Sequence, residues 1–187
     1  MAMCDLSNRN PMRFAMQTIS QTMTQGTATY VLPATVLAVS IVTIAIPSGS
    51  TAIERTIGQI SAYEYAALPQ KQQQGPSTSV FFNLQKIPTL TFWPTPDAGG
   101  PYTFNAQVFR NLYDVDPANL QGVDAPYRYL DALATNIAAR LAESYAPEKA
   151  PSLYAKFEER LRVVLGRDQE NVSLSLVPNL VSYHRIY

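Results

Sequence analysis

Few residues in this sequence could do acid–base or covalent chemistry. Its 187 residues include one histidine, His184, and one cysteine, Cys4. A single histidine excludes histidine pairs, zinc-protease motifs and most catalytic triads, and a single cysteine excludes an internal disulfide or a cysteine-built metal site. His184 lies near the end of the sequence with no carboxylate close by, and Cys4 precedes any clear element. We therefore expect neither residue to act as a base or a nucleophile.

The acidic residues form no convincing site either. Asp114 and Asp116 stand close together in a turn and could ligate calcium, but the rest of an EF-hand loop is missing. Glu158 and Glu159 are adjacent in a helical pattern and so point to different faces. No glycine-rich phosphate loop is present. We expect no catalytic residue, no cofactor and no metal, and we interpret the chain as a structural or binding protein.

Charge is unevenly distributed along the chain. Lysine plus arginine number 14 and aspartate plus glutamate number 14, so the formal net charge is zero, which disfavours a generally basic nucleic-acid binder. Residues 14–53 carry no charge, whereas residues 124–170 hold more than half of all charged residues. Exposed strands are usually guarded by charge, so an uncharged strand-rich region favours an oligomer whose subunits cover one another.

One uncharged segment, residues 28–47, is long enough to span a bilayer as a helix. However, Pro33 interrupts it, and threonine, serine and β-branched residues dominate. These features indicate a largely buried strand, so we expect no membrane contact. The first residues also lack the basic-then-apolar layout of a signal peptide.

The pattern of residues 17–113 predicts antiparallel β-structure. Strands are expected at 17–24, 27–33, 37–46 and 53–60. Ser61 and Glu64 match a capping box that opens a helix over 62–68. Residues 80–93 and 102–113 are expected to form a hairpin across the turn-rich residues 94–101. The cleanest period-two alternation gives one apolar face, made of Tyr102, Phe104, Ala106 and Val108.

Residues 126–166 change to a helical period and predict an antiparallel helix hairpin that covers the β-layer. The apolar stripe of the first helix contains Leu130, Leu133, Ala134, Ile137, Ala138, Leu141 and Tyr145. The residues expected to be mostly buried are Leu133, Ile137, Leu141, Phe157 and Leu161. The predicted fold is therefore α+β: an N-terminal segment 1–16 that could be irregular, a single domain 17–170, and an extended arm 171–187.

Three motifs carry a resemblance to a known family. They are ISAYEYAALPQK at 60–71, FFNLQ at 81–85 and PTLTFWPTPD at 88–97. In this order and spacing they resemble the head-to-tail adaptor, or connector, proteins of short-tailed bacteriophages, over residues 17–178. The family commonly has a helical segment before the first strand. Here only the short segment 1–16 precedes it, so that helix is expected to be missing or differently placed.

The resemblance implies a structural virion protein made in the bacterial host cytoplasm. It would form a ring of twelve copies between the portal and the tail nozzle or tube, with a central channel for the genome. Zero net charge suits a channel that lets DNA pass without specific binding. From its residues alone the arm could fold back on its own subunit. The resemblance implies instead that the arm binds a neighbouring copy or the portal, through Leu174, Leu176, Val181, Tyr183, Ile186 and Tyr187.

Two other functions stay open from the sequence. The chain could be another tail component, such as a nozzle or tail-tube subunit, which would share this composition. It could also be a carbohydrate-binding module that uses the aromatic hairpin around Trp93.

Overall fold

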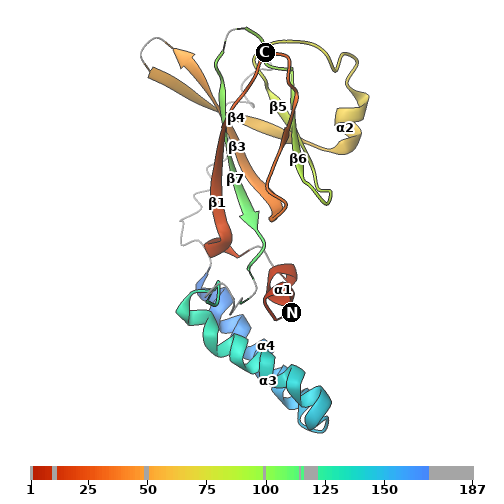
Figure 1. Ribbon diagram of the computed structural model, residues 1–187, viewed down its shortest axis with the longest axis vertical. Coiled ribbons are helices and arrows are strands. Elements are labelled where there is room, and N and C mark those ends of the chain that lie inside the picture. The colour runs from red at the N-terminus through yellow and green to blue at the C-terminus, as the bar shows by residue number, and fades with distance from the viewer. Residues whose placement is uncertain are drawn as a thin grey trace, which may run out of the picture.

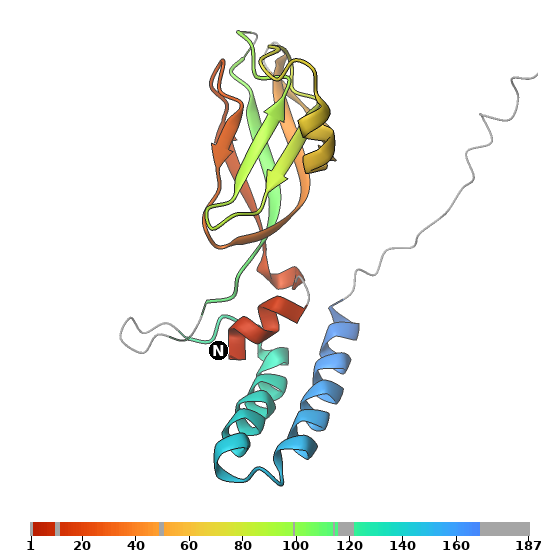
Figure 2. The same cartoon turned by 90° about the vertical axis from the view of Figure 1, so that its right-hand side faces the viewer.

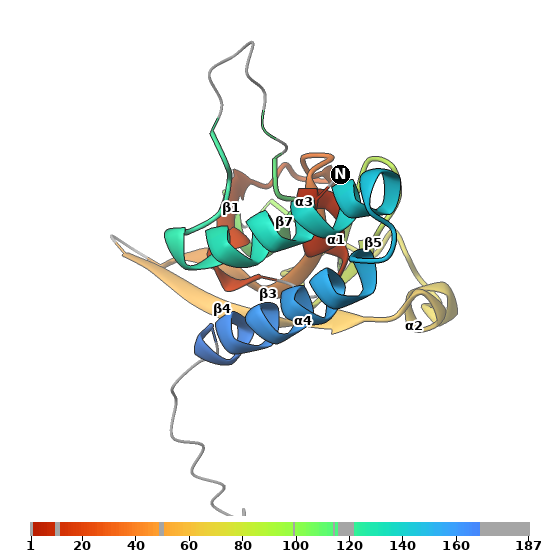
Figure 3. The same ribbon diagram turned by 90° about the horizontal axis from the view of Figure 1, so that it is seen from below.

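The computed structural model describes residues 2–9, 12–48, 51–98, 100–113, 115 and 122–168. These residues form an elongated α+β molecule with two parts (Figures 1 and 2). A β-sheet body lies at one end and two antiparallel helices lie side by side at the other (Figure 3). Helix α1 (Ala2–Arg9) sits between them. The predicted fold class is confirmed.

Seven strands form the sheet body, in the spatial order β1-β7-β3-β4-β5-β6-β2. All neighbouring strands are antiparallel except β4 and β5, which are parallel. The predicted hairpin of 80–93 with 102–113 is wrong, because β6 pairs with β5 and β2 whereas β7 pairs with β1 and β3. The strands are β1 (Met16–Thr22), β2 (Thr29–Val31), β3 (Val36–Ser48), β4 (Thr51–Ile60), β5 (Ser79–Asn83), β6 (Thr89–Trp93) and β7 (Thr103–Arg110).

The sheet folds over so that its two halves face each other (Figure 2). The long strand β4 belongs to both halves, since its first part pairs with β3 and its last residues pair with β5. Tyr30 on β2 contacts Phe104 on β7 and Phe92 on β6, at ring-centroid distances of 5.4 and 5.7 Å. The apolar face predicted for residues 102–108 is buried in this core, as expected.

The parallel pair β4 and β5 needs a crossover, and helix α2 (Ala62–Ala67) lies in it. The predicted capping box is present. The Glu64 backbone N–H donates to Ser61 Oγ at 3.2 Å, and the Ser61 N–H donates to Glu64 Oε2 at 2.7 Å. Both bonds satisfy N–H groups that a helix start otherwise leaves without partners.

The helix hairpin consists of α3 (Leu130–Tyr145), entered through the short helix η3 (Tyr127–Tyr129), and α4 (Ala150–Arg167). It does not cover the β-layer, and that prediction is wrong (Figure 1). The sheet already buries its inner face against itself. The helices instead share a second core with α1 and the short helix η1 (Arg13–Ala15).

The N-terminal segment is helical in part, contrary to the expectation of an irregular segment. Met3 and Leu6 of α1 are only 5% and 1% exposed and pack in the second core. Isolated helices this short are marginal in water, so tertiary contacts must stabilise it. The buried residues of the second core are Met3, Leu6, Met12, Ala15, Leu112, Tyr129, Ala132, Leu133, Phe157 and Leu161.

Candidate functional site

The outer face of α3 is an exposed apolar stripe. Ile137, Leu141 and Tyr145 are 49%, 55% and 84% exposed. The prediction that Ile137 and Leu141 are buried is therefore wrong, whereas Leu133, Phe157 and Leu161 are buried as predicted. The face opposite the stripe is the one that packs against the chain's own helices. The α3 stripe consists of Leu130, Ala134, Ile137, Ala138, Leu141 and Tyr145.

The buried face of α3 consists of Leu133 and otherwise of small and polar residues. Ala132, Ala139 and Ala142 are buried on this face, and such small side chains allow neighbouring helices to approach closely. Asn136 is fully buried, but its side chain is partnered on both sides. Its Nδ2 donates to Asp5 Oδ2 at 3.2 Å, and its Oδ1 accepts from Arg140 Nε at 2.9 Å. These two hydrogen bonds offset the cost of burying the Asn136 amide.

Asp5 is the centre of a charged cluster that fastens α1 to the hairpin. Arg9 Nε and Arg140 Nη2 each lie 3.3 Å from Asp5 Oδ2. Burial alone would raise the pKa of Asp5, but the Asn136 hydrogen bond and the two arginines hold it below its usual value. Arg9 also pairs with Glu158 on α4. The cluster therefore joins three helices through partly exposed ion pairs.

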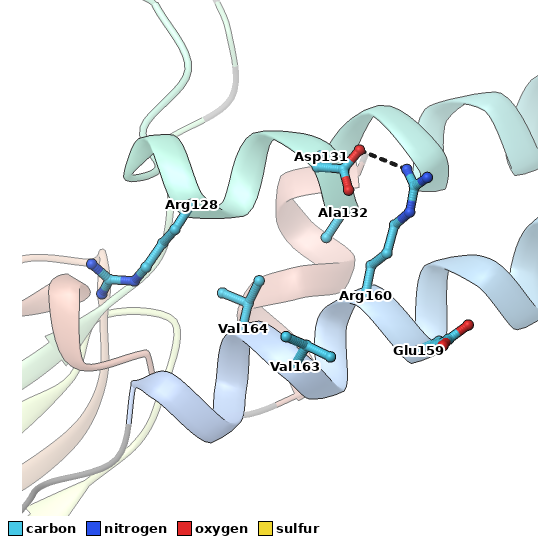
Figure 4. A pocket seen from close by; sticks show the side chains of 7 residues that line it. All are labelled: Arg128, Asp131, Ala132, Glu159, Arg160, Val163 and Val164. Atoms are coloured by element: carbon cyan, nitrogen blue, oxygen red, sulfur yellow. Dashed lines mark hydrogen bonds and ion pairs between the residues drawn. The ribbon is translucent and has the colours of Figure 1, made fainter.

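A shallow hollow of about 300 Å³ lies between α3 and α4 (Figure 4). Arg160 reaches across it from α4, and its Nη1 lies 2.6 Å from Asp131 Oδ1 on α3. Arg128, at the other end of the hollow, pairs with Asp168. Because both arginines are paired within the chain, we interpret the hollow as part of the helix packing. The residues that line it are Arg128, Asp131, Ala132, Glu159, Arg160, Val163 and Val164.

The β3–β4 hairpin is a second candidate surface, since its tip projects from the sheet body (Figure 1). Beyond Ala45, β3 pairs with β4 alone, because its pairing with β7 ends there. Ile53 near the tip is 59% exposed. The uncharged segment 14–53 includes β1, β2, β3 and the start of β4, so these strands lack the charges that usually guard exposed edges.

The outer face of the sheet near these strands is polar but almost uncharged. Ile41, 47% exposed, lies among hydroxyl and amide side chains. Glu54 is the single charged residue among them, and its Oε1 accepts from Asn105 Nδ2 at 3.1 Å. This shallow face is lined by Thr18, Ile41, Thr43, Glu54, Asn105 and Gln107.

Comparison with known protein families identifies the family of this chain. Residues 1–179 match the family described as the SU10 adaptor protein. The chain belongs to this family. The predicted resemblance to phage adaptors is thus confirmed, and the match also includes α1, which lies before the residues on which the resemblance rested. No curated protein matched the chain.

The family is one of structural phage proteins, which places the adaptor in the virion. Among the described residues, no three or more histidine, cysteine, aspartate or glutamate side chains gather as metal ligands would. Asp114, Asp116 and His184 lie outside those residues, as do the arm residues 171–187. The side chain of Cys4 is likewise not described. Within the described part of the adaptor, no helix is long and apolar enough to cross a bilayer.

Trp93, the centre of the carbohydrate-binding alternative, is half-buried in the adaptor. Its indole N–H donates to the Gln70 carbonyl at 2.9 Å. The indole N–H therefore links the 70–78 loop to β6.

Sequence reasoning missed the most exposed surfaces of the adaptor. The α3 stripe was recognised as apolar but assigned to the interior. The hairpin tip was read as the end of a strand, although β3 continues through Pro47 to Ser48. The missing charge in residues 14–53, which already favours an oligomer in the sequence, is the signal that points to this hairpin as a contact surface.

Proposed function

We propose that the adaptor forms a closed ring of twelve copies between the portal and the tail nozzle or tube, around a channel for the genome. The observation that carries the proposal is the α3 stripe, which runs the length of a helix roughly 24 Å long. Monomeric proteins rarely expose continuous apolar patches larger than a few hundred Å². A stripe with no charged member requires a partner.

The partner that fits the α3 stripe is a neighbouring copy of the adaptor. In a cyclic ring each copy uses one surface to contact a different surface of the next, so every copy can cover the stripe of its neighbour. The family membership supports contacts with other virion components in addition. Net charge of zero supports passage of DNA without the phosphate contacts that would retain it.

A charge placed in the stripe tests the ring. We expect Leu141→Glu to leave the fold intact, because the side chain is 55% exposed in the single chain, and to remove ring density at the vertex of purified virions. Leu84→Glu is a matched control, since Leu84 is 60% exposed but lies in the β5–β6 loop. Rings of normal copy number with Leu141→Glu would contradict the assignment of the stripe to a subunit contact. A ring located elsewhere in the tail would favour a nozzle or tube subunit.

We also propose that the arm binds the portal or a neighbouring copy. The support is its sequence: large apolar and aromatic side chains crowd a segment where solvent exposure is usual, and Pro178 blocks continuation of a helix. The residues proposed to bind are Leu174, Leu176, Val181, Tyr183, Ile186 and Tyr187.

Deletion of residues 182–187 tests the arm. We expect a folded chain with nearly unchanged circular dichroism that no longer binds portal rings in a pull-down. A truncated chain that still binds would exclude an essential role for these residues. A chain that fails to fold would show that the arm packs on its own subunit.

A further inference from the structure

Two strand edges of one sheet half lie open in the single chain. The half consists of β1, β7, β3 and β4 in that order. No described strand lies beside the outer edge of β1. On the other side, β4 pairs with β5 only from Gly58 to Ile60, so its earlier residues also have no described strand on that edge.

Hydrogen bonds near the strand ends show which backbone groups face these edges. Met23 N–H donates to the Tyr102 carbonyl at 2.7 Å, so the odd-numbered residues of β1 face β7. Gly58 N–H donates to the Thr78 carbonyl at 3.3 Å, so the even-numbered residues of β4 face away from β3. Successive residues alternate in direction along a strand. The groups at the open edges therefore belong to Thr18, Ser20 and Thr22 on β1 and to Ala52, Glu54 and Thr56 on β4.

Strand direction makes these two edges fit each other. Each of the three neighbouring pairs in this half is antiparallel, so β1 and β4 at its two ends run in opposite directions. When a second copy follows the first in the same orientation, its β1 lies antiparallel to the β4 of the first. Copies that repeat head to tail can thus extend the sheet while neighbouring strands remain antiparallel.

The side-chain faces also agree. Thr18 and Glu54 line the same outer face, whereas Ile19 and Ile57 pack toward the core. On both strands, therefore, the side chains of the even-numbered residues point outward. The backbone N–H and C=O groups of the same residues face the open edge. Residues directly opposite in a ladder must share a face. Pairing of even with even residues meets this condition.

We infer that β1 of one copy adds to β4 of the next as an antiparallel strand, with Ser20 opposite Glu54. This inference rests on the proposed ring and names the contact that closes it. Strand addition through main-chain hydrogen bonds is a common mode of recognition. β1 contains no charge and no proline to discourage it, and the hairpin that carries β4 projects toward solvent. The opposed pairs are Thr18 with Thr56, Ser20 with Glu54, and Thr22 with Ala52.

Disulfide trapping tests the register. In this ladder Gln21 stands opposite Ile53 in a pair that is not hydrogen-bonded, where the two Cα atoms come to within about 4.5 Å. We expect virions carrying Gln21→Cys and Ile53→Cys in a Cys4→Ser background to give a ladder of covalent multimers on a non-reducing gel after oxidation. Either cysteine alone should give none.

A proline on the open edge tests the hydrogen bonds. Ser20→Pro removes an N–H that points away from β7, which an edge strand tolerates. We expect the variant to stay folded and its incorporation into virions to fall at least tenfold. Val31→Pro is the matched control, because Phe92 N–H bonds to the Ala28 carbonyl and Leu32 N–H to the Pro88 carbonyl, which turns Val31 away from β6. This variant should be incorporated normally.

The outcomes separate the edge contact from the ring. Normal rings that give no cross-linked ladder and accept Ser20→Pro would overturn the edge contact and leave the ring standing. Covalent dimers from Gln21→Cys alone would show pairing of two β1 strands and would also overturn it. Single adaptor copies at the vertex, seen by imaging of virions, would overturn the ring and the edge contact together.

Discussion

The sheet body and the helix layer bury different kinds of residue. The sheet body encloses its aromatic and branched side chains, and its first three strands carry no charge. The helix layer has a second core of its own, but along α3 that core takes mainly alanine, threonine and asparagine beside Leu133, whereas Ile137, Leu141 and Tyr145 stay exposed on the other side. An apolar pattern in a sequence thus shows that contacts are needed, but it does not show whether the same chain supplies them.

The largest expected effects come from substitutions that leave a cavity in the core of the sheet body or in the core of the helix layer. Phe104 and Phe157 are both fully buried. Each substitution by alanine should lower the free energy of unfolding by about 3–5 kcal/mol. The two cores share no residue. Phe104→Ala should therefore lower mainly the melting temperature of the sheet, which the fluorescence of Trp93, the single tryptophan, reports. Phe157→Ala should lower mainly the melting temperature of the helices, which far-ultraviolet circular dichroism reports. Equal shifts of both transitions would show that the two parts unfold as one unit.

The connection between the two parts depends on Arg110 and Asp124. Arg110 Nη1 and Nη2 lie 2.5 and 3.0 Å from the Asp124 carboxylate, which also accepts the Tyr113 N–H at 2.9 Å. The Arg110 hydrogen bond is the main reason that the pKa of Asp124 lies below its usual value. Because the folded pKa is the lower one, this stabilisation is complete above the unfolded value of about 3.9 and is lost as pH falls below it.

Asp124→Asn should therefore lower the free energy of unfolding by about 1.5–3 kcal/mol at neutral pH. The difference from the parent chain should shrink in acid, where the parent carboxylate is itself protonated. Denaturant titrations of both chains at several pH values measure this difference in the free energy of unfolding. A difference that does not depend on pH would show that the ion pair contributes little.

A smaller effect is expected at the capping box of α2, which has no buried residue. Ser61→Ala should reduce stability by about 1 kcal/mol, and Ser61→Thr should keep most of the cap. Because α2 packs little, hydrogen exchange of the amides of residues 62–67 should speed up while the strands keep their protection. Loss of protection throughout the sheet would show that α2 supports the crossover as a whole.

The smallest effect on stability is expected where the sequence alone suggested a large one. Leu141→Ala should change the free energy of unfolding by less than about 0.5 kcal/mol, as at other exposed sites. Leu133→Ala on the opposite face of the same helix should cost about 2–5 kcal/mol. Chemical denaturation of the two variants compares them. A large loss with Leu141→Ala would mean that this side chain packs within its own subunit.

Local chemistry in the sequence was sufficient for several elements. The alternation over residues 102–108 reports a strand with one buried face, and the capping box fixes the start of α2 because both bonds are made by neighbouring residues. The two helices of the hairpin follow from their period in the same way. The resemblance to phage adaptors was also correct, since the family matches nearly the whole chain.

Other features depend on contacts that no local pattern contains. Residues 94–101 have turn chemistry, but a turn does not require the strands beside it to pair, and here it leads from one half of the sheet to the other. The interior position of Asn136 requires Asp5 and Arg140. For the same reason α1, with its few apolar residues, could not be identified without its partners.

The links between distant parts of the sequence also set an order of events during synthesis. Asp5 bonds to Asn136 and Arg9 pairs with Glu158, residues 131 and 149 positions away, and among the described strands β1 pairs with β7 alone. A ribosome adds roughly 5–20 residues per second, so these early segments wait several seconds for their partners. The hairpin of β3 and β4 can close long before then, because its partners are adjacent in sequence. We therefore expect β1 to stay sensitive to protease on the nascent chain until β7 has left the ribosome, and α1 until α4 has.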